Sequence, residues 1–239
     1  MDKRVADVWY GVDQPGPGLW RLREVHIDPF LAGNIWLVPG SERALVIDSG
    51  TGMRSPAPLA EAIAGVPILA VALNRFYDHA GGLCHFDARA CHAEEAAAIS
   101  EPTGKTSESD DFVNDEMFSA LPEAGYRASD YRMQGAAPTR LLEEGETIDL
   151  GGRRIEVLHT PGMTAGSLCL LERETGSLFT SDTMYDDPLD RGLEPLDPGP
   201  FAESLKRLRE LPVSRVYGGH FEPMTGARMH EIIDTYLAQ

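Results

Sequence analysis

The stretch that decides the fold reads Asn74-Arg75-Phe76-Tyr77-Asp78-His79-Ala80-Gly81-Gly82. It follows an uninterrupted apolar run, Ile68–Leu73, which is typical of a strand buried on both faces of a sheet. A carboxylate and an imidazole, Asp78 and His79, come within two helical turns after this run, and the glycine pair behind them allows a helix to pack closely. The sequence therefore predicts a buried central strand that delivers Asp78 and His79 at its carboxyl end.

Further motifs lie on both sides of this stretch. They are the two N-terminal strand motifs Asn34–Val38 and Leu45–Gly50, the His-Thr-Pro-Gly turn of His159–Ser167, the strand end Leu178–Thr183 and the late Gly-His of Val216–His220. Together they resemble the metallo-β-lactamase superfamily over nearly the whole chain, in particular its glyoxalase II-like and lactonase-like metallo-hydrolases. Several motifs in order at family-like spacing are far more specific than one. The resemblance implies an α/β fold, a four-layer αββα sandwich with the site along one edge.

The superfamily's H-x-H-x-D-H motif and its later His and Asp positions supply the ligands of two metal ions. The first ion's own three ligand positions hold Asn74, Phe76 and Met163 here, so the resemblance implies that the first site is lost. The four ligands implied for the second site are all present, and they are Asp78, His79, Asp182 and His220.

Two imidazoles and two carboxylates suit one hard or borderline divalent metal, with zinc as the first candidate and iron or manganese as the others. An ion with a position open to solvent acidifies bound water and polarises a carbonyl. Asp78 is the candidate catalytic residue, because it would act both as a ligand and as the acceptor of the water proton. These features predict a metal-dependent hydrolase that uses a single metal in the second site against a small ester, lactone, thioester or amide.

Two other functions stay open. A catalytically inactive relative could bind a small ligand or a partner in the old cleft, and the loss of every ligand private to the first site favours this alternative. Redox chemistry at a lone iron is disfavoured, because the superfamily's iron dioxygenases use the first site. Retention of Asp182 and His220 favours the hydrolase.

The residues that replace the first-site ligands are informative in themselves. Phe76 and Met163 are large and apolar, so they are expected to fill the space of the first metal and to dry one wall of the cleft. A drier wall raises the pKa of a nearby carboxylate, and Asp78 is the one expected to respond. Met163 is a poor candidate for a ligand, because one thioether among carboxylates suits no common ion.

Composition limits the class of partner. The 239 residues are 42% hydrophobic, which predicts a single domain over residues 1–239. A formal charge of −17 disfavours nucleic acid and favours a small-molecule substrate. Neither a leader-like N-terminus nor an 18-residue apolar run is found, so no membrane association is expected. Three cysteines without a C-x-x-C pair indicate reduced thiols and a cytoplasmic location. A homodimer stays open.

Short strands and helices are expected to alternate along the chain. The first half is predicted to contain a hairpin at Ile35–Val38 and Ala44–Ile47 and a helix at Pro58–Ala64. A second half is predicted to begin near Arg140. Its expected strands are Thr147–Leu150, Arg154–Leu158, Ser167–Leu171, Ser177–Thr180 and Arg215–Tyr217, and its expected helices are Phe201–Leu211 and one near Arg228–Leu237.

Two segments are predicted to cover the site. An insertion at about residues 101–137 is the expected lid, with helical spacing of Phe112, Met117, Phe118 and Leu121. The acidic, Pro-rich loop that begins at Tyr185 and runs through Asp190 to Pro200 follows Asp182 directly, so Tyr185 is a candidate contact of the substrate pocket. A solvated surface loop is the alternative there.

The remaining polar residues near the motifs are assigned structural roles. His159 is expected to be hydrogen-bonded in its turn, and Asp48 is expected to brace the turn beneath the site. His85 and His92 lack partners at ligand spacing, which disfavours a displaced metal site.

Assignment of the metal to the second site predicts the outcome of three substitutions. Asp182→Ala or His220→Ala should abolish metal binding, because each removes a ligand, whereas Met163→Ala should leave it nearly intact. Metal content per chain, measured by inductively coupled plasma mass spectrometry, checks this. Equal loss of metal in all three variants would refute the second-site assignment.

Overall fold

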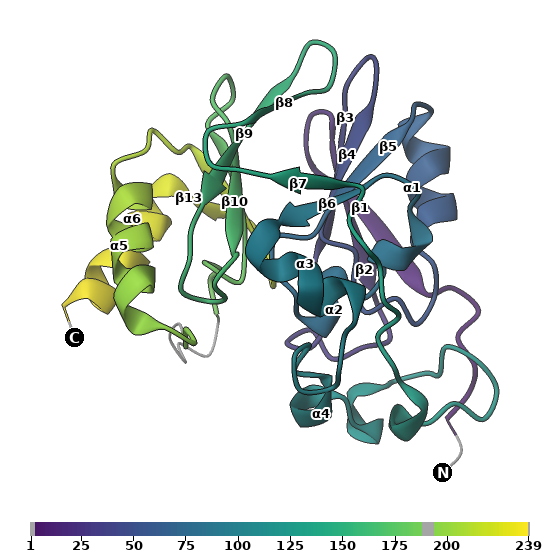
Figure 1. Cartoon of the computed structure of the whole chain (residues 1–239). Coiled ribbons are helices and arrows are strands. Elements are labelled where there is room, and N and C mark those ends of the chain that lie inside the picture. The colour runs from purple at the N-terminus through teal and green to yellow at the C-terminus, as the bar shows by residue number, and fades with distance from the viewer. Residues whose placement is uncertain (1–2, 188–193, 239) are drawn as a thin grey trace.

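The computed structural model describes residues 3–187 and 194–238. Two β-sheets face each other, and helices cover their outer faces (Figure 1). The first sheet has seven strands in the order β1-β2-β3-β4-β5-β6-β7, and the second has six in the order β13-β12-β11-β10-β9-β8. The predicted αββα sandwich is therefore confirmed.

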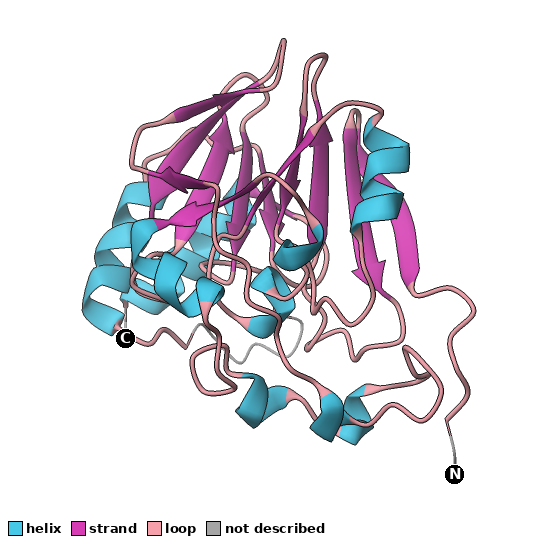
Figure 2. Cartoon of the chain, turned by 45° about the vertical axis from the view of Figure 1, so that its right-hand side comes forward, coloured by secondary structure: helices cyan, strands magenta, loops and turns pink. Residues whose placement is uncertain are grey.

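The first sheet comes from the N-terminal part of the chain. Its strands β1 to β4 pair antiparallel, whereas β4 to β7 are parallel neighbours. Short helices connect and follow these parallel strands (Figure 2). The strands are β1 (Tyr10–Gly16), β2 (Leu19–Glu24), β3 (Ile35–Pro39), β4 (Ala44–Ile47), β5 (Ile68–Val71), β6 (Arg89–His92) and β7 (Arg140–Leu142). The helices are α1 (Ala57–Ala64), α2 (Tyr77–Ala80), α3 (Ala93–Ser100) and α4 (Ser109–Phe112), with 3-10 turns η1 (Leu83–His85), η2 (Asp115–Met117) and η3 (Ala128–Asp130).

The second sheet comes from the C-terminal part. Only β11 and β12 are parallel in it, and the other neighbours are antiparallel. Two long helices lie on its outer face (Figure 1). The strands are β8 (Thr147–Asp149), β9 (Arg154–His159), β10 (Leu168–Glu172), β11 (Ser177–Ser181), β12 (Arg215–Gly218) and β13 (Met224–Thr225), and the helices are α5 (Pro198–Arg209) and α6 (Gly226–Leu237).

The alternation of side chains along the strands builds the layers. In β10, Leu168 and Leu170 pack into the core between the sheets, whereas Cys169 and Leu171 pack against α5 and α6. In β3, Trp36 points into the inter-sheet core, while its neighbours belong to the core beneath the first sheet's helices. Both sheets are therefore apolar on both faces, which explains their continuous hydrophobic runs.

Most predicted elements are confirmed, with shifted boundaries. The largest shift is at α5, which begins at Pro198 rather than Phe201, because Pro is well suited to the first turn of a helix and Asp197 caps it by accepting from Gly199 N. The central strand ends at Val71 rather than Leu73, since the Leu73 amide turns away to donate to Asp48 Oδ1.

One sequence prediction about topology was wrong, and one hairpin was not predicted. The second half does not begin near Arg140, because β7 pairs with β6 and completes the first sheet. The hairpin β1–β2, which was not predicted, precedes the hairpin at Ile35–Val38 and Ala44–Ile47 and pairs through β2 with β3. That first hairpin is rich in polar residues, so its hydrophobic pattern is weak.

The helical arrangement expected for Phe112, Met117, Phe118 and Leu121 within residues 101–137 was also wrong. This segment forms only α4 and isolated turns. Met117 and Phe118 are buried in the core of the first sheet, and Phe118 pairs with Ile27 in an isolated bridge. The apolar residues therefore anchor an irregular segment rather than line one helix face.

Whether the whole chain is one domain stays a prediction. Among the residues that the structure describes, none of the helices is both long and apolar enough to cross a bilayer.

The inter-sheet core allows a stability prediction. Phe179→Ala should lower the free energy of unfolding by about 3–5 kcal/mol, because the ring is fully buried and stacks on Tyr217 at 5.0 Å between centroids. Val12→Ala, at a side chain 41% exposed, is the control and should change it by less than about 0.5 kcal/mol. Denaturant unfolding followed by circular dichroism measures both, and equal small effects would contradict this account of the core.

Candidate metal centre

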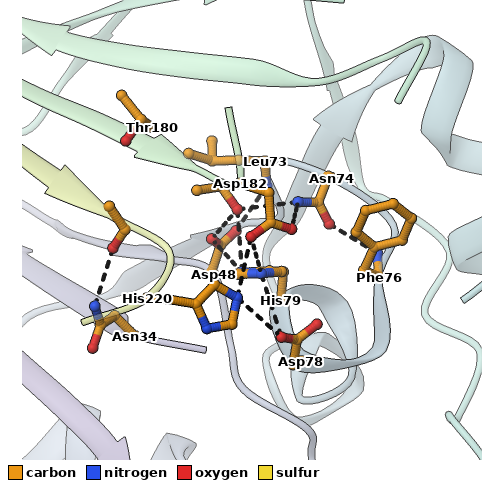
Figure 3. A network of polar contacts seen from close by, with 12 residues as sticks. Asn34, Asp48, Leu73, Asn74, Phe76, Asp78, His79, Thr180, Asp182 and His220 are labelled. Atoms are coloured by element: carbon orange, nitrogen blue, oxygen red, sulfur yellow. Dashed lines mark hydrogen bonds and ion pairs between the residues drawn. The ribbon is translucent and has the colours of Figure 1, made fainter. Parts of the chain in front are cut away.

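The candidate ligands meet at one edge of the sandwich because the strands that precede them end there. Asp78 and His79 lie in α2 after β5, Asp182 follows β11, and His220 follows β12 (Figure 3). Since β11 and β12 are parallel, their carboxyl ends lie side by side. Gly219 is required beside them, because a Cβ there would lie 2.7 Å from His79 Cε1.

Backbone strain concentrates around this edge. The described part of the chain holds four non-glycine residues with left-handed φ: Asp48, Glu108, Ser181 and Phe221. Ser181 and Phe221 adjoin candidate ligands, Asp48 contacts His79, and Glu108 lines the neighbouring cavity. Such conformations cost about 1–3 kcal/mol each and collect at functional sites. The strained residues therefore gather at the same edge of the sandwich as the motif residues.

Two imidazole nitrogens and two carboxylates converge on one point. His79 Nε2 lies 3.6 Å from Asp78 Oδ2 and 3.0 Å from Asp182 Oδ1. His220 Nε2 lies 3.4 Å and 3.2 Å from the same two oxygens. All four residues are buried. Ligand atoms of a tetrahedral ion with bonds of about 2.0–2.1 Å stand roughly 3.3–3.4 Å apart, and these four distances bracket that value.

The four groups are not equally placed. Asp78, His79 and His220 each offer a ligand atom within 4.8 Å of the other two, and Asp182 falls outside this set. Asp182 Oδ1 nevertheless lies closer to the two imidazole nitrogens, at 3.0 Å and 3.2 Å, than Asp78 Oδ2 does, so Asp182 remains a candidate ligand.

The tautomer of His79 fits metal binding. Its Nδ1 lies 3.0 Å from Asp48 Oδ2, and the same carboxylate accepts the Leu73 amide at 2.9 Å. A carboxylate behind Nδ1 keeps the proton there, which leaves the Nε2 lone pair facing the cluster. That buried Nε2 has no hydrogen-bond partner among the described residues. The donor set fits a divalent cation, and Asp48 braces the site as predicted.

The loop that carries His220 is held by Asn34, which begins one of the N-terminal strand motifs, and by Arg21, which lies outside all of the motifs. Asn34 Nδ2 donates to Gly218 O at 3.1 Å and to Phe221 O at 2.9 Å. The buried Arg21 also donates to Phe221 O, at 3.0 Å. A lone Arg in a strand gives no sequence signal for this role.

Asn74, at a position that the resemblance assigns to the first site, contacts Asp182 and its neighbour. Its Nδ2 donates to Asp182 Oδ2 at 2.9 Å and to Ser181 Oγ at 3.1 Å, while its Oδ1 accepts the Phe76 amide. An amide N–H therefore satisfies the Asp182 oxygen that faces away from the two imidazoles. The two apolar residues at first-site positions, Phe76 and Met163, are buried and line the cavity beside the cluster.

The pKa values of the two carboxylates shift in opposite directions. Burial raises the pKa of Asp78, and the neighbouring Asp182 adds to this, against the attraction of the two imidazoles. Burial also opposes ionisation of Asp182, but His79 and His220 outweigh it and hold its pKa well below the usual range. Burial lowers the pKa of His79, yet its three carboxylate neighbours raise it overall. The cluster therefore favours a positive charge at its centre.

The other predicted residues lie outside the cluster, but Tyr185 lines the cavity beside it. Its ring lies 5.1 Å from the His220 ring, centroid to centroid. His159 is hydrogen-bonded through Nε2 to Ala165 O at 2.9 Å, as predicted, and stacks on His92. His85 pairs with Gly52 O. Residues 188–193 of the predicted loop lie outside the described part of the chain.

An αββα sandwich with Asp and His side chains gathered at its strand ends defines a recognisable class of fold and site. A family model described as "Metallo-beta-lactamase superfamily" matches residues 77–220. The chain belongs to the metallo-β-lactamase superfamily.

Similar proteins and solved structures agree with this family assignment. The chain is 35% identical over 245 residues to "Acyl-coenzyme A thioesterase MBLAC2" of Gallus gallus, covering 97% of this chain and 87% of that protein. Over 40% of this chain and 37% of the other, it is 35% identical to "Hydroxyacylglutathione hydrolase" of Chelativorans sp. (strain BNC1). A metallo-beta-lactamase from Pontibacter korlensis has the same fold, with a TM-score of 0.70 at 14% identity over 96% of this chain and all of that one.

The contact between Asn74 and Asp182 generates a prediction. Asn74→Leu should weaken zinc binding about 10–100-fold, the usual effect of removing a group that orients a metal ligand. Met163→Leu is the matched control, because it changes a neighbouring side chain without touching the carboxylates. Competition with a chromophoric chelator gives both affinities. Unchanged affinity in Asn74→Leu would mean that the amide does not orient Asp182.

Proposed function

We propose that this protein is a metal-dependent thioester hydrolase with one divalent ion in the second site. Asp78, His79, Asp182 and His220 would hold that ion. The observation that carries the proposal is the convergence of four buried imidazole and carboxylate groups at spacings suited to a tetrahedral ion. The nitrogen and oxygen donors favour zinc, with iron or manganese as alternatives.

The choice of thioesters has two supports. Both kinds of relative have names that specify thioester hydrolysis, acyl-coenzyme A in one case and hydroxyacylglutathione in the other. The chemistry of the site agrees, because a thioester releases a thiolate whose conjugate acid has a pKa of about 8.5 and which leaves without a general acid. An amide nitrogen needs a proton to leave. A site with a single evident proton acceptor therefore suits a thioester better than an amide.

The bound ion would supply Lewis acidity, polarising the carbonyl and acidifying water. Asp78 would take the proton from the attacking water, because its carboxylate lies in the wall of the cavity. Asp48 keeps His79 in one tautomer, and Asn74 holds Asp182 in one orientation. Phe76 and Met163 exclude water from one wall of the cavity.

The lid and the substrate contact belong to the same proposal. Residues at about 101–137 are inferred to cover the cavity, since Glu108 and Phe112 from this segment line it. The Tyr77 amide donates to Ser107 O at 3.0 Å, which ties this segment to α2. Tyr185 closes the wall beside His220 and is inferred to contact the substrate.

A ligand-binding protein without catalysis is the second candidate. It is favoured by the apolar filling of the first site, where Phe76 is 7% and Met163 6% exposed. The two candidates differ in turnover and in metal content, so one preparation distinguishes them.

Metal removal and return test the proposal. Protein purified without chelator or affinity tag should hold close to one divalent ion per chain by inductively coupled plasma mass spectrometry. Chelation should abolish hydrolysis of an acyl thioester, followed by thiol release, and one equivalent of zinc should restore it. In the zinc-loaded protein, Asp78→Asn should lower kcat by about 10²–10⁴-fold through loss of the base. Metal-free protein with full activity, or metal-loaded protein without any, would contradict the proposal.

A further inference from the structure

The cavity beside the cluster has a distinct chemical character. It measures about 390 Å³, and Asp78, Asp182 and His220 form part of its wall. His220 is 5% exposed, and its buried Nδ1 has no hydrogen-bond partner within the described part of the chain. The cavity and the cluster are therefore one continuous site.

Aromatic rings supply much of the remaining wall. Phe30 lies 6.2 Å from the His220 ring and Tyr185 lies 5.1 Å from it, centroid to centroid, so the two flank the same imidazole. Ring faces carry partial negative charge and attract organic cations. The aromatic lining residues are Phe30, Phe76, Tyr77, Phe112 and Tyr185.

Acidic side chains add to this character. Beyond the candidate ligands, Glu108, Asp187 and Glu194 line the cavity, and the lining residues that the structure describes include no Lys or Arg. The ion that Asp78 and Asp182 would hold offsets their two charges. Glu108, a lining carboxylate outside the ligand set, then adds a negative charge to the wall of the cavity.

Glu108 is the carboxylate best placed to act on a substrate. It is half-buried, and no ion pair or side-chain hydrogen bond joins its carboxylate to another described residue. The nearby Arg75 is already engaged, by Glu95 Oε2 at 3.3 Å and by Thr106 O at 3.0 Å. Arg75 also stacks over Phe76 rather than lining the cavity. Glu108 is therefore available to a positive group that enters from solvent.

We propose that this cavity selects by the charge that lies close to the thioester sulfur, favouring a positively charged organic group there over a neutral one of the same shape and over a negative one. Glu108 and the aromatic wall provide this selectivity. The proposal rests on the proposed thioester hydrolase activity for its substrate class, while the charge selectivity belongs to the cavity itself.

Three butyryl thioesters of matched size test the ranking. Their thiols are thiocholine, its uncharged carbon isostere 3,3-dimethylbutanethiol, and the anionic 3-mercaptopropionate. Each kcat/KM is divided by the hydroxide-catalysed rate of the same ester, which removes differences in leaving-group reactivity. The cation should be preferred over its neutral isostere by about tenfold or more, and the anion should be the poorest substrate.

Variants separate a local effect from net charge. Glu108→Gln should reduce the preference for the cation to about threefold or less. Glu174→Gln removes the same charge from the β10–β11 turn, at the end of β11 opposite the cluster, and should leave the preference unchanged. Raising the ionic strength should reduce the wild-type preference, because the cavity opens to solvent.

A binding experiment makes the inference independent of turnover. Choline and its neutral isostere 3,3-dimethylbutanol are compared on the zinc-loaded protein by saturation-transfer NMR, and choline should bind more tightly in a way that depends on Glu108. Choline binding without hydrolysis of any ester would support charge selectivity and overturn the thioesterase. Hydrolysis with equal rates for cation and isostere, or with the anion preferred, would overturn charge selectivity and leave the thioesterase standing.

Discussion

Four buried polar groups that converge at one point are the constraint on which the rest of this structure depends. Two carboxylates cannot share a dry site unless positive charge lies between them, and here two imidazole nitrogens stand 3.0 to 3.6 Å from both. The fold must therefore hold His79 and His220 in fixed orientations. Asp48 does this for His79, and Asn34 holds the loop of His220 through two backbone carbonyls.

The sandwich provides that rigidity at a cost in backbone strain. Asp48, Ser181 and Phe221 adopt left-handed conformations beside the cluster, at about 1–3 kcal/mol each. Such strain persists only where surrounding structure fixes it, and the apolar core between the sheets does so. Trp36 joins core and site directly, because its indole packs between the sheets while its Nε1 donates to Gly218 O at 3.1 Å.

The sequence could predict the site's members and the brace at Asp48, but not the support that Arg21 gives. Asp78, His79 and His220 follow buried apolar strands, so their convergence was predictable from the alternation of strands and motifs. Arg21, in contrast, acts through tertiary contacts about two hundred residues away, at Phe221 and Glu222, which no local pattern encodes. The irregular segment around Glu108 was mispredicted as a helix for the same reason: Met117 and Phe118 meet the core through a bridge to Ile27 rather than along one helix face.

An amide and two apolar side chains, rather than a gap, occupy the positions that the resemblance assigns to a first metal, and Asn74 among them contacts Asp182. A bridging carboxylate shared by two ions would need both oxygens neutralised. Here the Asn74 amide satisfies one oxygen of Asp182, and the other is left for the imidazole side of the cluster. Phe76 and Met163 contribute to the wall of the cavity beside the cluster. Under the proposed assignment of one ion, that ion offsets the charges of Asp78 and Asp182, so a further carboxylate in the cavity wall, such as Glu108, shapes the field that a substrate meets.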